Sequence, residues 1–104
     1  MKVIEILPRD HARLFEALVA KEAAIRKQGR GTYVRVGRKT SDSANWRHKT
    51  YKGSVLLKRS RSQSVIARVR AGSPETERKL LSSFLGFVDR HSGSQIASIT
   101  IHYP

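Results

Sequence analysis

The chain has 104 residues and carries 21 Lys and Arg side chains against 8 Asp and Glu, a formal net charge of +13. Leu, Ile, Val and Phe make up a quarter of the chain, above the level at which highly charged chains stay disordered, so one folded domain over residues 1–104 is expected. The absence of cysteine excludes disulfide frameworks and Cys-ligated metal sites. No segment is apolar enough to suggest a membrane span, and we expect a cytoplasmic protein.

A strand and a helix are predicted before residue 30. Residues 2–7 (KVIEIL) are rich in β-branched side chains and precede Pro8, which predicts a strand that ends there. Asp10 suits the N-cap position, and apolar side chains then recur near the helical period until Gly29. This pattern predicts a helix over residues 11–27.

A second strand is predicted over residues 31–39, where side chains of different character alternate. Val34 and Val36 share one face of this strand, and the other face carries Tyr33, Arg35 and Gly37. The polar segment 40–53 follows, and part of it is expected to extend the next strand.

A β-hairpin is predicted from residues 54–58 and 64–70, which are both β-prone and are joined by a polar turn. Alternation in the second arm places Val65, Ala67 and Val69 on one face. Ile66, Arg68 and Arg70 then form a basic ladder on the more exposed face.

A second helix and a last strand complete the chain. Ser73, Pro74 and Glu75 combine a capping hydroxyl, a proline at the first helical position and an acid that complements the helix dipole. The apolar stripe that follows predicts a helix to about residue 91. Residues 95–103 alternate and predict a strand with its apolar side chains, Ala97, Ile99 and Ile101, directed inward.

The element order is β-α-β-β-β-α-β, which predicts an α+β two-layer sandwich: a mostly antiparallel sheet with both helices on one face. The helix-free face is then expected to carry Tyr33, Arg35, Ile66, Arg68 and Arg70. This open sheet face is the candidate binding surface.

The excess positive charge is localised in the central segment, residues 29–72, which holds twelve basic side chains against Asp42 alone. Such a surface attracts polyanions. Cations interleaved with aromatic rings are typical of proteins that hold single-stranded nucleic acid, because cations contact phosphates while rings stack on bases. We expect a non-enzymatic domain that binds nucleic acid, RNA or single strands above all, with weak sequence specificity. The candidate binding residues are Arg30, Tyr33, Arg35, Arg38, Lys39, Trp46, Arg47, His48, Lys49, Tyr51, Lys52, Arg68 and Arg70.

Other interpretations remain open on the sequence. Trp46 can instead anchor its segment to the core, and Tyr51 can pack on a strand. The basic face can bind an acidic protein, as part of an interaction or assembly module. His48 beside Arg47 and Lys49 can act as the general base of a small metal-free nuclease. No motif predicts a catalytic residue, metal or cofactor, and a homodimer is possible.

Overall fold

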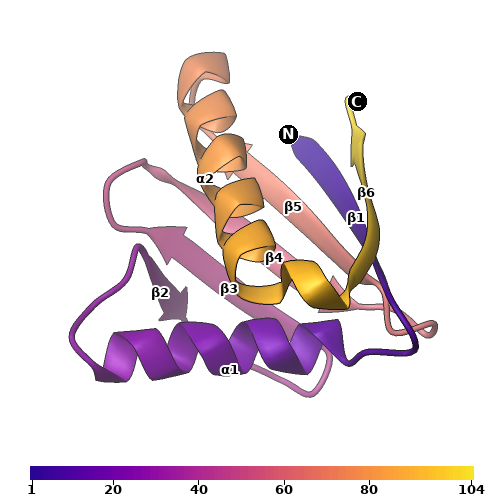
Figure 1. Cartoon of the computed structure of the whole chain (residues 1–104). Helices are drawn as coiled ribbons and strands as arrows, with labels where there is room; N and C mark the ends of the chain where they lie inside the picture. The colour runs from indigo at the N-terminus through magenta and orange to yellow at the C-terminus, as the bar shows by residue number, and fades with distance from the viewer.

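The computed structural model describes all 104 residues and contains two α-helices and six β-strands (Figure 1). In chain order they are β1 (Lys2–Pro8), α1 (Leu14–Lys27), β2 (Tyr33–Val36), β3 (Ser43–His48), β4 (Gly53–Arg59), β5 (Val65–Ala71), α2 (Pro74–Ser92) and β6 (Ile96–His102). A short 3₁₀ turn, Gly93–Gln95, links α2 to β6. Neither helix combines the length and the apolar character that crossing a membrane requires.

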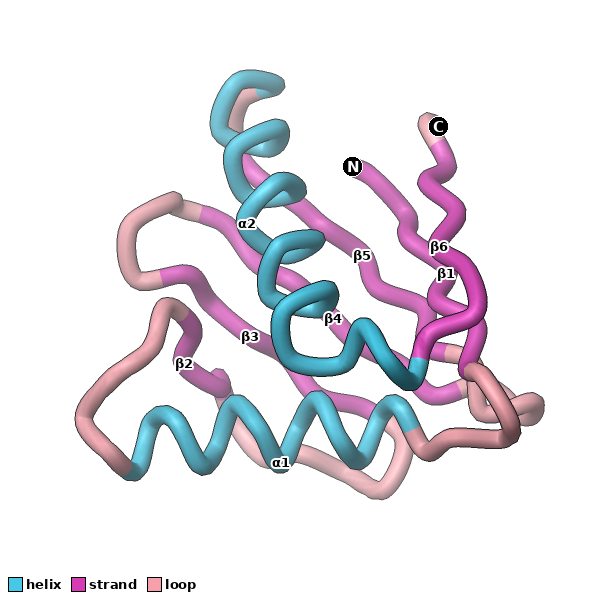
Figure 2. The backbone as a smooth tube through the Cα atoms, in the orientation of Figure 1, coloured by secondary structure: helices cyan, strands magenta, loops and turns pink.

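The strands form one antiparallel sheet in the order β2-β3-β4-β5-β1-β6. Both helices lie on the same face of this sheet, α1 beside β2 and α2 over β4 and β5, and the opposite face is open (Figure 2). The expected α+β sandwich is confirmed, and so is the β4–β5 hairpin.

The segment between the second predicted strand and the hairpin contains a strand of its own, β3. Its sequence (SANWRH) is polar overall, which conceals an alternation of period two. Ala44, Trp46 and His48 are buried, whereas Arg47 is exposed. β3 inserts between β2 and β4, and it therefore fixes which side of the sheet each residue of the basic segment faces.

The first helix begins three residues later than the sequence predicts. Asp10 and His11 adopt left-handed backbone conformations, with φ of 53° and 59°, so Asp10 cannot be an N-cap. The N-cap is Arg13, and no side chain caps this end of α1. The turn after Pro8, closed by a hydrogen bond from Ala12 N–H to the Arg9 carbonyl (3.0 Å), occupies the residues that the helix was expected to use.

The second helix has the predicted start. The Ser73 hydroxyl accepts a hydrogen bond from the Thr76 N–H at 3.2 Å, and Pro74 follows it at the first helical position. Leu80, Phe84 and Val88 lie on the inner side of α2 and are fully buried. They pack on the sheet in a core that includes Phe87, which is also buried.

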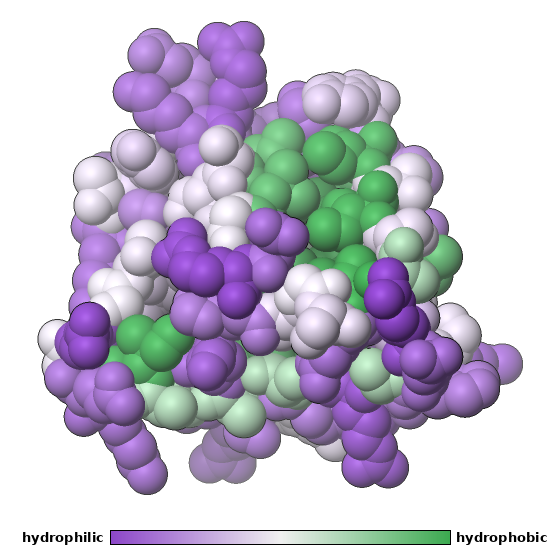
Figure 3. Space-filling view, viewed as in Figure 1, coloured by the Kyte–Doolittle hydropathy of each residue, from purple (hydrophilic) through white to green (hydrophobic).

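The helices leave one side of the sheet's inner face partly uncovered. Ile99 and Ile101 of β6 pair with Ile6 and Ile4 and so share the helix side of the sheet, as predicted. Ala97 was expected to point inward too, but it lies at the bulge beside Pro8 and is exposed, and Ile96 is the buried residue there. Ile99 nevertheless remains 36% exposed. Figure 3 shows apolar side chains gathered at the surface between α2 and the β1–β6 edge.

Candidate nucleic-acid interface

Four cations lie on the helix-free face of the sheet. Alternation along each strand sets their direction: Val55 and Leu57 point into the core, so Lys58 points out, and β5 places Arg68 and Arg70 outward in the same way. Arg47 is the outward residue of β3 between the buried Trp46 and His48. We call the set Arg47, Lys58, Arg68 and Arg70 the basic sheet face.

The strand register places these cations in neighbouring rows. Arg47 pairs with Ser54, and Ser54 pairs with Arg70, so the two arginines lie two strands apart, about 10 Å. Arg68 precedes Arg70 by two residues along β5, about 7 Å. Lys58 and Arg70 lie about 13 Å apart along the strands. The basic sheet face therefore covers an area suited to several phosphates of one chain.

No acidic side chain neutralises the basic sheet face. The ion pairs of the protein involve other cations, such as Arg59 with Glu16 and Lys2 with Glu77. Glu5 is the one acid among the strand residues that face outward on this side, and it forms no ion pair with any of the four cations. The Arg70 Nε donates only to the Met1 Sδ (3.3 Å). The four cations are therefore free to bind an external anion.

The β3–β4 loop, residues 49–52, extends this surface. Lys49 and Lys52 are exposed, and the Lys49 N–H donates to the Thr32 carbonyl at 2.8 Å, which ties the loop to the start of β2. A surface cavity of about 440 Å³ joins the two regions, and its lining includes Arg47, Lys49 and Lys52. The loop lysines and the basic sheet face therefore form one continuous cationic surface.

His48 holds the loop in place from inside. Its Nδ1 accepts hydrogen bonds from the Thr50 and Tyr51 N–H groups at 2.9 and 3.0 Å. The ring proton is therefore on Nε2, which donates to the Ser83 Oγ at 3.1 Å. Burial lowers the pKa of His48, which keeps the ring neutral. Both nitrogens serve the fold, so His48 has no lone pair free to act as a general base.

Tyr51, the third aromatic candidate of this region, is half-buried. Its ring stacks on the His48 ring with centroids 4.5 Å apart and planes 28° apart. One face of the Tyr51 ring is thus already covered by the protein. This contact with His48 of β3 agrees with the alternative interpretation, in which Tyr51 packs on a strand.

Trp46 and Tyr33 lie in the core, and the expectation that their rings stack on bases is wrong. Trp46 is 0% exposed and Tyr33 is 2% exposed. The two rings pack 5.5 Å apart, and both contact Phe87 edge-on. The Tyr33 Oη is 3.0 Å from the Ser83 Oγ, and burial raises the pKa of this phenol to about 12.

Arg35 also lies on the helix side, because it shares a face with Tyr33 and pairs with Trp46. Its placement on the open face was therefore wrong, and Val34 and Val36 point outward instead. Arg35 is half-buried and close enough to the buried Glu22 of α1 to favour the charged carboxylate. The charge of Arg35 thus acts on the buried Glu22, and Arg35 is not part of the binding surface.

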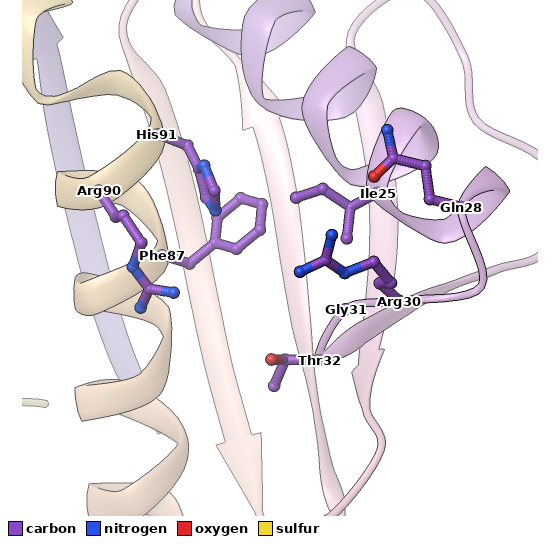
Figure 4. Close-up of a pocket in the computed structure, with 8 residues that line it drawn as sticks. All are labelled: Ile25, Gln28, Arg30, Gly31, Thr32, Phe87, Arg90 and His91. Atoms are coloured by element: carbon purple, nitrogen blue, oxygen red, sulfur yellow. The ribbon is translucent and has the colours of Figure 1, made fainter.

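A second cavity, of about 300 Å³, lies between the loop after α1 and the last turns of α2. Figure 4 shows Arg30 reaching into it from the loop, while Arg90 borders it from α2 with Phe87 and His91 beside it. Burial lowers the pKa of His91, as do Lys21 and Arg90 nearby. Arg30 and Arg90 therefore extend the cationic surface from the end of the sheet to the side that carries the helices.

The remaining candidates, Arg38 and Lys39, are exposed in the β2–β3 loop, residues 37–42. Antiparallel pairing puts this loop at the opposite end of β3 from Lys49 and Lys52. They therefore lie apart from Lys49 and Lys52, at the end of β3 where Ser43 pairs with Lys58. Sequence reasoning missed Lys58, although the alternation around Val55 and Leu57 predicts its outward direction, and it missed Arg90, which only the tertiary structure brings to Arg30.

The arrangement as a whole offers cations for anionic oxygens and no aromatic ring on the open face. Half-buried aliphatic side chains, Leu56 and Ile66, lie between Lys58 and Arg68. In the comparisons with known proteins, no family model, curated protein or solved structure matches this chain.

Proposed function

We propose that this protein is a non-enzymatic domain that binds single-stranded nucleic acid, RNA or DNA, across its open sheet face. The observation that carries the proposal is the basic sheet face: Arg47, Lys58, Arg68 and Arg70 face outward together, and none is engaged in an ion pair. Cations in such rows bind phosphate oxygens. Lys49 and Lys52 extend the path at one end.

Single strands fit this surface better than duplex DNA. Six strands at about 4.8 Å spacing make a sheet about 24 Å wide, twice the width of the B-DNA major groove of about 12 Å. A sheet of this kind cannot enter the groove as a two-stranded ribbon does. A flexible single strand can instead lie along the face and follow its cations.

The expected sequence preference is weak. Phosphate contacts position a nucleic acid but carry no sequence information, and the stacking rings that the sequence suggested, Trp46 and Tyr33, are buried. Bases that approach the sheet meet the aliphatic Leu56 and Ile66. These give apolar contact without distinguishing one base from another.

The test is a salt titration of binding, followed by the fluorescence anisotropy of labelled single-stranded RNA, single-stranded DNA and duplex DNA. The double variant Arg68→Ala, Arg70→Ala should lower the slope of log affinity against log salt by about 1.4, since each phosphate contact to a single strand contributes about 0.7. Lys21→Ala, Lys27→Ala removes the same charge from the exposed side of α1 and should leave the slope unchanged.

An acidic protein partner is the competing function for the same cations. Poly-glutamate of similar charge provides the comparison, because it offers carboxylates without bases or sugars. Equal binding of poly-glutamate and single-stranded RNA at each salt concentration contradicts the proposal. So does an equal loss of affinity in the two double variants, since that indicates a response to net charge alone.

A further inference from the structure

The last strand of the sheet, β6, has an edge with no neighbour. Its seven residues (IASITIH) include no Lys, Arg, Asp, Glu or Pro, the residues that normally keep an exposed edge from pairing with another chain. The opposite edge strand, β2, is only four residues long, carries Arg35, and is packed by α1. β6 is therefore the edge that is open to pairing.

Apolar side chains continue from β6 onto the helix beside it. Ile99 is 36% exposed, and Ile101 is half-buried against the core. Leu81 and Leu85 lie on the side of α2 away from Ser83, which faces Tyr33 and His48, so they face β1 and β6. This is the apolar surface seen between α2 and the β1–β6 edge in Figure 3.

We propose that β6 pairs antiparallel with β6 of a second copy of this chain. The charge of the protein favours this occupant. Residues 73–104 carry as many acids as bases, whereas the rest of the chain carries the whole excess of +13. β6 itself carries no Lys, Arg, Asp or Glu, so two copies can pair through it without placing charged side chains directly opposite each other, and it offers no charge that would attract an acidic partner.

The register follows from the regular part of the strand. Residues 98–102 pair with β1 without interruption, and a bulge follows at Leu7 and Pro8. A two-fold axis at Thr100 aligns all five residues with their symmetry mates, so that Thr100 lies opposite Thr100 and Ile99 opposite Ile101. Such β-branched pairs are favourable across antiparallel strands. The two isoleucine pairs then lie on the helix side and extend the apolar surface across the interface.

The proposed dimer has a consequence for the shape of the protein. A two-fold axis perpendicular to the sheet keeps both helix layers on one side and joins the strands into one sheet of twice the width. Both basic sheet faces then lie on the same side. The pairing itself depends only on β6 and does not rest on the proposed nucleic-acid function.

Disulfide crosslinking of single-cysteine variants tests the register directly, since the chain has no native cysteine. Opposed residues of antiparallel strands have Cα atoms about 4.5 to 5.5 Å apart, within the range of a disulfide. Thr100→Cys should form a covalent dimer under mild oxidation. Val36→Cys, at a position that is also exposed but on the opposite edge strand, is the matched control and should stay monomeric. Equal crosslinking of the two variants overturns the proposal.

The second measurement is the mass in solution by size-exclusion chromatography with light scattering, in high salt to screen the net charge. The wild-type chain and Val36→Lys should run at twice the monomer mass. Thr100→Lys should run as a folded monomer, because it places two lysines opposite each other in the dimer but beside Glu5 within one chain. A wild-type monomer at every concentration, or a folded Thr100→Lys dimer, overturns the proposal.

Discussion

His48 on β3 and Ser83 on α2 are joined by a hydrogen bond of 3.1 Å between Nε2 and Oγ, and Tyr33 reaches the same Oγ at 3.0 Å. Through His48 Nδ1 this contact continues to the backbone of the β3–β4 loop. A single hydroxyl on the helix thereby connects the core to the loop that carries two of the exposed lysines.

Ser83→Ala should destabilise the fold, because it leaves the His48 Nε2–H and the Tyr33 hydroxyl without their partner. A lost hydrogen bond to a buried group costs about 1 to 3 kcal/mol, and the half-exposed position of Ser83 favours the lower end. Urea denaturation measures the change in the free energy of unfolding. Ser82→Ala, the exposed neighbour on the same helix, is the control, and an equal effect of the two substitutions contradicts this role of Ser83.

The fold should lose stability as the pH falls below about 6.5. Burial lowers the pKa values of His48 and His91, so between the folded and unfolded pKa values the unfolded chain binds protons that the folded chain does not. His48→Asn, which cannot take up a proton, should show a smaller fall between pH 7.5 and pH 5.5 in denaturation experiments. The exposed His11→Asn should retain the wild-type fall, and an unchanged slope in His48→Asn would exclude His48 as its source.

Glu22 should have the opposite effect on stability. The side chain is 2% exposed, and burial raises its pKa, although Arg26 and Arg35 oppose this. Its contribution to stability is therefore present at low pH and is lost as the pH rises through the raised pKa. Glu22→Gln should unfold at higher urea than the wild type at pH 7. Glu16→Gln breaks the pair with Arg59 and should give no such gain; a loss of stability in Glu22→Gln would refute the account.

Gly53 should not tolerate a side chain. A Cβ at this position would overlap the Arg70 carbonyl oxygen and lie 2.8 Å from the Leu80 Cδ2, so β4 would have to move from β5 and α2. Gly53→Ala should cost about 1 to 3 kcal/mol, as overpacking does. Gly72→Ala is the matched control, since a Cβ there meets nothing within 4 Å. The midpoint of thermal denaturation should be lower for Gly53→Ala than for Gly72→Ala. Equal midpoints would be inconsistent with the close approach of the added Cβ to Arg70 and Leu80.

The two loops of the basic segment should contribute unequally to binding. Lys49→Ala, Lys52→Ala removes cations that border the same cavity as Arg47, whereas Arg38→Ala, Lys39→Ala removes the same charge from the opposite end of β3. The first variant should lower the salt slope for single-stranded RNA by about 1.4, and the second should lower it less. Anisotropy titrations measure both, and an equal reduction would show that the cluster defined here is not the binding path.

The sequence was sufficient where a local pattern decides the structure. The cap at Ser73, the stripe of α2 and the β4–β5 hairpin depend on residues close together in the chain, and the structure has them where the pattern predicts. The outward direction of Arg68 and Arg70 follows equally from alternation within β5. The nucleic-acid role of these cations remains a prediction.

The face of β2 was decided by contacts far away in the sequence. Tyr33 and Val34 are both β-prone, so alternation alone groups the residues without saying which group is inside. Tyr33 faces the core because Ser83, fifty residues later, partners its hydroxyl and Trp46 packs on its ring. Burial of Trp46 follows from the same packing, since the free energy is lower when a large aromatic ring is removed from water than when it stays exposed on a polar segment.

The sequence by itself determined the α+β class, the concentration of positive charge in the middle third and the neutrality of the C-terminal third. Only the tertiary structure decided which cations share a face, that β3 is a strand, and that Ile99 lies inward yet uncovered. The physical reason is that local backbone preferences set the period of each element. The position of the helices over the sheet decides which of the two alternating sets of side chains along each strand is buried.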